Sequence, residues 1–167
     1  MNRYGRVSSA ANPKGGRAWY ACLYARGRTY RIDTLALPHG ADISIPPILG
    51  PRYIGAIAGD RDRGPVFVSI DLRTGKLKRQ LEAAGCSDCG HSILASLMSS
   101  NGSLAMISDL DSGFGTEVTV DVQRADSRGT VLLDSSTTGS IDESSLRLSA
   151  GKVTWVKGGV ERSASIE

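Results

Sequence analysis

The chain has 167 residues, of which 40% are hydrophobic and 22% are charged, and its formal net charge is +3. This length and composition fit one globular domain with a buried core and exclude a disordered chain. Basic and acidic residues are interspersed, so we predict no nucleic-acid partner. No stretch approaches the roughly 20 consecutive apolar residues of a membrane helix, so we also predict no membrane span.

The first residues predict a flexible segment. Residues 1–16 are polar and carry no apolar periodicity, so we expect them to be a flexible lead-in. Residues 17–167 are expected to form a single all-β repeat domain. The basic N-terminal stretch contains no apolar core of a signal peptide, so the sequence alone does not exclude a cytoplasmic protein.

A hairpin is predicted at the start of the domain. Residues 18–24 and 29–32 are rich in strand formers, and Gly27 lies in the turn between them. A further short strand is predicted at 42–45, before two consecutive prolines that interrupt strand pairing.

The middle of the chain contains an internal repeat. Residues 53–81 and 104–133 share a pattern of apolar runs, acidic turns and glycines with a period of about 50 residues. The sequence alignment pairs Ala56 with Ala105, Asp71 with Asp121, and Gly75 with Gly129. The first apolar run, 53–58, is almost uninterrupted, which is typical of a strand that is buried on both faces.

The remaining pattern consists of short strands separated by glycine turns. The predicted strands are 66–72, 77–81, 92–98, 103–108, 117–123, 130–134, 145–148, 152–156 and 161–166. We therefore predict an all-β fold of antiparallel four-stranded blade-like repeats, a partial or small β-propeller, with a β-sandwich as the alternative.

The number of predicted blades is low. The last segment supplies only three strands, and the N-terminal hairpin would complete that blade. Because ordinary propellers have about four to eight blades, the chain is predicted to be an open arc, a homo-oligomer, or part of a longer protein.

Several phrases resemble known propeller proteins. Residues 68–81, VSIDLRTGKLKRQL, resemble the outer hairpin of blades of the TolB/WD40-like and quinoprotein-like kinds. The run from Leu104, with SLRL at 145–148 and TW at 154–155, resembles the end of secreted, functionally uncharacterised propeller-like proteins of actinobacteria. The resemblance implies a propeller-like fold and a location outside the cytoplasm. It implies no catalytic residues, because the matching motifs are structural.

A CxxC motif is the sharpest local feature. Cys86 and Cys89 are followed by His91, a set that would hold zinc if a fourth ligand such as Cys22 or His39 lay nearby. The structural alternatives are a local Cys86–Cys89 disulfide, a bridge from Cys22 to either of them, or free thiols.

Two acidic turns have the spacing DxDxG. Asp109 and Asp111 precede Gly113, and Asp60 and Asp62 precede Gly64. Alternate carboxylates before a glycine would bind calcium, although neither turn is followed by the bidentate glutamate of an EF-hand. The alternative is a solvated turn, in which Asp and Gly are common in any case.

The remaining polar residues favour binding over catalysis. The chain contains no phosphate-binding glycine loop and no GxSxG motif, and we predict neither an enzyme nor a resident cofactor beyond the zinc and calcium alternatives. The leading hypothesis is a non-enzymatic binding or scaffold module for a protein or carbohydrate ligand. The second is a polysaccharide- or peptide-acting hydrolase or lyase that uses paired aspartates, among them Asp42, Asp71, Asp121 and Asp142. The third is a metal- or thiol-dependent module centred on Cys86, Cys89 and His91.

Overall fold

The chain is built from antiparallel β-strands. The computed structural model describes residues 4–11, 17–24, 27–32, 42–43, 48–60, 64–83, 90–111, 118–137 and 139–167. No α-helix occurs in these ranges, and no helix that is long and apolar enough to cross a membrane is found in them. The predicted all-β class is therefore confirmed.

The strands form four sheets. Sheet I contains β1 (Gly5–Ala11), β2 (Arg17–Leu23) and β3 (Arg28–Arg31). Sheet II contains β4 (Asp42–Ile43), β5 (Ile48–Leu49), β6 (Tyr53–Asp60), β7 (Gly64–Asp71) and β8 (Lys76–Glu82). Sheet III contains β9 (Gly90–Met98), β10 (Leu104–Asp111), β11 (Val118–Asp126) and β12 (Gly129–Thr137). Sheet IV contains β13 (Ile141–Ser149), β14 (Lys152–Lys157) and β15 (Val160–Ser165).

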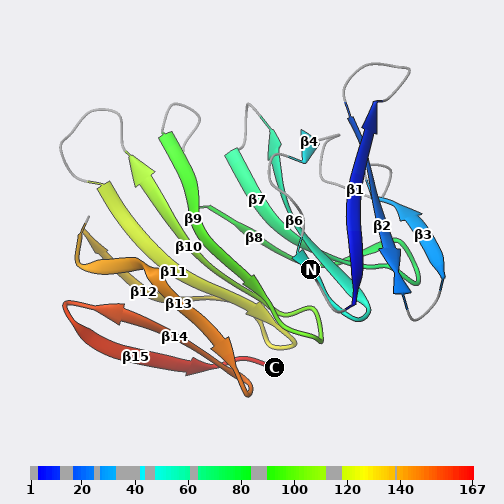
Figure 1. Cartoon of the computed structure of the whole chain (residues 1–167). Coiled ribbons are helices and arrows are strands. Elements are labelled where there is room, and N and C mark those ends of the chain that lie inside the picture. The colour runs from blue at the N-terminus through cyan, green and yellow to red at the C-terminus, as the bar shows by residue number, and fades with distance from the viewer. Residues whose placement is uncertain are drawn as a thin grey trace.

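The sheets pack face to face in chain order, and three apolar clusters fill the spaces between them. One cluster joins β2 to β6 and β7, a second joins β6, β7 and β8 to β10 and β11, and a third joins β10 and β11 to β13 and β14. Figure 1 shows the sheets side by side, from the blue N-terminal sheet to the red C-terminal sheet. Sheets II and III are thus covered on both faces, which is why β6 and β10 begin with nearly continuous apolar runs.

Strand β7 shows how the alternation of side chains serves two neighbours. Val66, Val68 and Ile70 point to the cluster shared with sheet I, whereas Phe67 points to the cluster shared with sheet III. Successive side chains of a strand face opposite sides, so neighbouring residues of β7 enter different clusters. Phe67 is fully buried, so both faces contribute to the core.

The residue alignment of the repeat is shifted by one position. Ala56 packs toward sheet I, which precedes its own sheet, but Ala105 packs toward sheet IV, which follows its own sheet. The residue that faces the preceding sheet at this point of β10 is Met106. A one-residue shift exchanges the two faces of a strand, so the predicted pairing of Ala56 with Ala105 is wrong.

The structure also corrects the end of the repeat. Asp71 is the last residue of β7, and the last residue of β11 is Asp126 rather than Asp121. Backbone nitrogens of the residues two positions later, Arg73 and Arg128, each donate to the carboxylate at 2.9 Å. Asp71 and Asp126 are therefore the equivalent positions.

The N-terminal region differs from the prediction in two respects. Strand β1 lies inside residues 1–16, where a flexible lead-in was expected, because Gly5–Ala11 pairs along its whole length with β2. The N-terminal hairpin does not complete sheet IV in the described pairings: it forms sheet I with β1. The pattern of β1, GRVSSAA, has too few apolar residues to signal a strand by itself.

Candidate functional site

The predicted metal and thiol residues are only partly described. Cys86 and Cys89 lie outside the described residues, and Cys22 on β2 is a half-buried free thiol that forms no bridge. His91 lies on β9 and packs against Gly64 of sheet II, where an added Cβ would come within 1.9 Å of His91 Nε2. The imidazole therefore fills the space that the glycine leaves, and its buried Nδ1 has no hydrogen-bond partner among the described residues.

The predicted calcium residues lie at the end of β10. The Asp109 carboxylate accepts a hydrogen bond from the Ser92 backbone nitrogen at 2.6 Å, and Asp111 is the last residue of the strand. The described ranges contain no group of three or more His, Cys, Asp or Glu side chains that could hold a metal. Zinc and calcium binding at the predicted positions stay predictions, because residues 84–89 and 112–117 are not described.

The structure distributes the predicted aspartates over different sheets. Asp71 binds Arg52 in sheet II, and Asp142 in sheet IV accepts a hydrogen bond from the Ser144 backbone nitrogen at 2.9 Å. Asp121 lies within β11 of sheet III, and the side chain of Asp42 is not described. Asp71 and Asp142 thus have local structural partners instead of facing one another across a groove.

A pocket that the sequence analysis missed lies where turns of successive sheets meet. It has a volume of about 530 Å³, within the range of about 300–1,000 Å³ that is usual for small-ligand sites. Its wall is formed by the β5–β6, β9–β10 and β13–β14 turns, together with Tyr4 before β1 and Ile166 after β15. We call it the turn pocket.

The turn pocket follows the repeat of the sequence. Three of its apolar side chains, Ile48, Met98 and Leu148, are spaced by 50 residues, and so are Gly50, Ser100 and Ala150 in the turns themselves. Each sheet from II to IV therefore contributes the same apolar position and the same turn. The period of about 50 residues was visible in the sequence, but the turns around residues 50, 100 and 150 were not recognised as one set.

Hydrogen bonds fix the β9–β10 turn. The Ser99 backbone nitrogen donates to the Ser103 carbonyl at 2.9 Å, and the Gly102 nitrogen donates to the Ser99 carbonyl at 3.1 Å. Gly102 has a φ of +82° and lies against the Tyr53 ring, where an added Cβ would be 2.9 Å from Cγ. A side chain at this position would both strain the backbone and collide with the ring. Glycine is therefore required at this position of the turn.

The β13–β14 turn is strained at the pocket. Ala150 and Gly151 connect the paired residues Ser149 and Lys152, and Ala150 has a φ of +47°. Alanine disfavours this left-handed conformation, in which Asn or Gly is common. The Gly151 carbonyl accepts a hydrogen bond from the Ile166 nitrogen at 2.9 Å, so the turn and the C-terminal segment hold each other in place.

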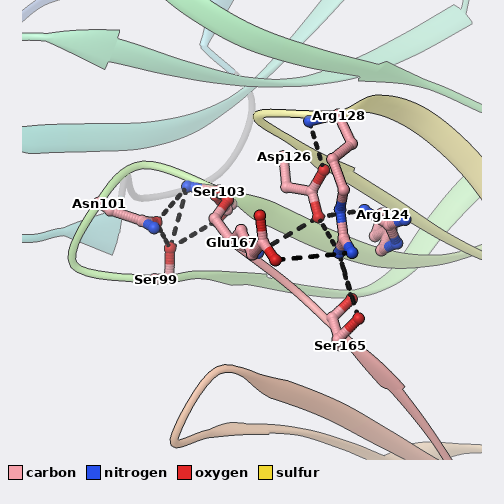
Figure 2. Close-up of polar contacts among 8 residues, drawn as sticks. All are labelled: Ser99, Asn101, Ser103, Arg124, Asp126, Arg128, Ser165 and Glu167. Carbon is pink, nitrogen blue, oxygen red and sulfur yellow. Dashed lines mark hydrogen bonds and ion pairs between the residues drawn. The ribbon is translucent and has the colours of Figure 1, made fainter.

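A buried ionic cluster fastens that C-terminal segment to sheet III (Figure 2). Asp126, whose side chain is fully buried, contacts Arg124 and accepts a hydrogen bond from Arg128 Nη2 at 2.8 Å. It also accepts a hydrogen bond from the Glu167 backbone nitrogen at 3.2 Å, while the Ser103 hydroxyl donates to the Glu167 carbonyl. Ile166 is thereby positioned in the pocket wall.

The same cluster explains the acidity of Asp126. Burial alone would raise the pKa of this carboxyl, but hydrogen bonds from Arg128 and Glu167 and the charge of Arg124 outweigh burial. The pKa of Asp126 therefore lies well below its usual value, and the carboxylate stays ionised at neutral pH.

A second cluster joins sheets III and IV. Asp134 on β12 accepts hydrogen bonds from Trp155 Nε1 at 2.9 Å, Lys157 Nζ at 2.8 Å and Arg162 Nη1 at 3.1 Å. Burial would raise the pKa of Asp134, but the bonds from Lys157 and Trp155 and the nearby positive charges lower it. Trp155 is buried and belongs to this junction.

The chemistry of the turn pocket is neutral. Its described lining combines the hydroxyl groups of serines and of Tyr4 with the Asn101 amide and aliphatic side chains, and it contains no Asp, Glu, His, Cys, Lys or Arg side chain. Such a lining can bind and orient an uncharged molecule. No family model and no curated protein matches this chain.

Proposed function

We propose that the protein is a non-enzymatic binding module whose ligand occupies the turn pocket, and that its four sheets are consecutive blades of a propeller-like arc. The face-to-face packing of sheets in chain order supports the propeller interpretation. So does the repetition of the same turn at one end of sheets II, III and IV. Propeller folds commonly bind ligands where such turns converge on a shared surface.

The observation that carries the proposal is the composition of the turn pocket. Five separate parts of the chain converge on a volume of about 530 Å³ whose lining combines hydroxyl, amide and aliphatic groups. General acid–base catalysis requires a titratable group within hydrogen-bond reach of the substrate. The described lining offers hydrogen bonds and apolar contact instead, which favours binding. A location outside the cytoplasm is proposed from the sequence resemblance alone.

A ligand screen with a blocked pocket tests the proposal. Short peptides and soluble oligosaccharides would be screened by saturation-transfer NMR against the natural protein and a Ser100→Trp variant. Ser100 is exposed in a pocket turn, so the indole would fill the opening without entering a core. The matched control is Ser163→Trp, which places the same ring at an exposed position of β15.

The expected result is that at least one ligand binds the natural protein and the Ser163→Trp variant but not the Ser100→Trp variant. Equal binding to all three proteins would move the ligand away from the turn pocket. Turnover of a screened compound, lost on substitution of one aspartate or histidine, would contradict the non-enzymatic assignment.

A further inference from the structure

The turn pocket contains a hydrogen-bond donor whose direction is set by the fold. Asn101 Oδ1 accepts from the Ser99 hydroxyl and, at 3.1 Å, from the Ser103 backbone nitrogen. A backbone N–H can only donate, so the amide oxygen of Asn101 must face it. Figure 2 shows the contacts that join Asn101 to Ser99 and Ser103. The amide nitrogen, Nδ2, donates to none of the described residues in the hydrogen bonds of this structure.

The same pocket is also lined by aliphatic side chains, which we call its aliphatic floor. Ile48, Met98 and Leu148 line the pocket from three different sheets, and Ile166 joins them from the C-terminal segment. Burying a charged group against such a floor would remove its hydration without supplying an opposite charge. The ligand group that enters the pocket must therefore be uncharged. Met98 is unbranched and flexible, so it can adapt to aliphatic groups of different shape.

The composition also separates two kinds of uncharged ligand. A sugar ring needs a flat apolar surface for stacking, which aromatic rings provide, and Tyr4 is the one aromatic residue in the described lining. An aliphatic side chain needs aliphatic neighbours, and the floor has four. A peptide also presents a carbonyl oxygen within a few bonds of each side chain, which suits a pocket whose lining contains both aliphatic side chains and an N–H donor.

We infer, on the basis of the proposed function, that the turn pocket recognises an uncharged peptide segment. One aliphatic side chain of this segment lies against Ile48, Met98 and Leu148, and a neighbouring main-chain carbonyl accepts a hydrogen bond from Asn101 Nδ2. Asn101 is then the residue that determines specificity, because it requires an acceptor at that point of the ligand. A ligand that lacks the acceptor would leave a donor unpaired in the complex.

Three small uncharged or charged probe molecules test the inference. They are acetyl-Ala-Leu-Ala-amide, the charged acetyl-Ala-Asp-Ala-amide, and the disaccharide cellobiose, each titrated into the natural protein and followed by NMR. We expect the leucine peptide to bind at least tenfold more tightly than the aspartate peptide, and cellobiose not to compete with it. The Ser100→Trp variant should bind none of them.

Two variants examine the separate contacts. Asn101→Asp keeps an oxygen for Ser99 and Ser103 but replaces the N–H donors with an anionic acceptor, so it should weaken the leucine peptide at least tenfold at an unchanged melting temperature. Ile48→Thr keeps a branched side chain on a strand residue and introduces a hydroxyl into the floor, so it should weaken the leucine peptide several-fold. Asn101→Gln, which retains an amide donor on a longer arm, should recover part of the loss.

The outcomes distinguish this inference from the proposed function. If Ser100→Trp abolishes binding of the leucine peptide but Asn101→Asp leaves it unchanged, the peptide binds in the pocket without a hydrogen bond from Asn101, and the role inferred for Asn101 is wrong. Binding of cellobiose in the pocket without binding of the leucine peptide would overturn the peptide assignment and keep the proposed function. Preferential binding of the aspartate peptide would overturn the uncharged ligand class. If no probe and no screened compound binds in a manner sensitive to Ser100→Trp, both proposals fall.

Discussion

Asp71 and Asp126 occupy the same position at the ends of β7 and β11, but their surroundings differ. Both carboxylates accept a 2.9 Å hydrogen bond from a backbone nitrogen two residues later. Asp71 then pairs with Arg52, whose side chain is 44% exposed. Asp126 is fully buried between Arg124 and Arg128 and also binds the backbone of Glu167. Asp71 stabilises its own turn, whereas Asp126 joins sheet III to the C-terminal segment.

The comparison distinguishes the local hydrogen bond that an aspartate makes in its turn from the contacts that neighbouring segments add to the same carboxylate. The local geometry is the same in both sheets, because an aspartate two residues before a backbone N–H closes a turn wherever it occurs. Only sheet III has the C-terminal segment lying over its turn, so only there does the carboxylate hold distant parts of the chain together. Both carboxylates are buried, so the energetic weight of the repeated aspartate is set by its partners: an exposed arginine for Asp71, and a buried arginine with the C-terminal backbone for Asp126.

Asp126→Ala should have the largest effect. The substitution leaves the Arg124 guanidinium, 11% exposed, without its carboxylate, and it frees the Glu167 backbone nitrogen. Removing one partner of a buried ion pair typically costs about 3–5 kcal/mol. Chemical denaturation should show a loss in the free energy of unfolding of this size. A loss below about 1 kcal/mol would mean that the cluster is not a structural junction.

Asp134→Ala should have an intermediate effect. It leaves Trp155 Nε1 without its acceptor at the junction of sheets III and IV, and it removes the carboxylate from Lys157 Nζ, which keeps its hydrogen bond to the Ser135 carbonyl. Lys157 and Arg162 are 22% and 48% exposed and can regain water, so we expect a loss of about 2 kcal/mol, mainly from the unpaired indole N–H. Tryptophan fluorescence should shift as Trp155 becomes more hydrated. An unchanged spectrum with unchanged stability would contradict this assignment.

Asp71→Ala should have a smaller effect than either. Arg52 is already largely hydrated, and its ring contact with Tyr53, at 5.1 Å, does not require the carboxylate. The lost turn bond to the Arg73 nitrogen should cost about 1 kcal/mol. The same denaturation experiment measures it beside Asp126→Ala. Equal losses for the two variants would show that the additional partners of Asp126 do not separate the two positions.

Acid should weaken the protein through the same carboxylates. The pKa values of Asp71 and Asp126 are lowered in the folded state, so each carboxylate contributes stability above its unfolded pKa of about 3.9 and loses it as the pH falls. Between pH 5 and pH 3 the contribution of Asp126 should decrease by about 1 kcal/mol. Asp126→Asn has no carboxyl to titrate there, so its free energy of unfolding should depend less on pH. A pH dependence identical to that of the natural protein would exclude Asp126 as its source.

Most strands could be predicted from the sequence, and the exceptions have physical causes. Val66, Phe67 and Val68 are all apolar, which predicts a strand that is buried on both faces. In the structure the two valines enter one apolar cluster and Phe67 enters the other. Strand β1 has no such pattern in its sequence. It is a strand because it pairs with β2 along its whole length. The alignment of Ala56 with Ala105 failed because two small apolar residues look alike whichever face they occupy.

The turn pocket illustrates the same limit for function. The residues at intervals of 50, such as Ile48, Met98 and Leu148, were present in the sequence as an ordinary apolar repeat. Nothing in their type distinguishes core residues from pocket residues, because both are aliphatic. These residues line a pocket only because three turns, Tyr4 and Ile166 converge in the folded protein.

The sequence by itself determined the all-β class, the repeat of about 50 residues and the positions of the glycine turns, because strand periodicity and positive φ depend on neighbouring residues. The tertiary structure decided which face of each sheet meets which neighbour, which partners surround Asp71 and Asp126, and where turns separated by 50 residues converge. These properties depend on contacts between distant segments, whose free energy no local pattern records.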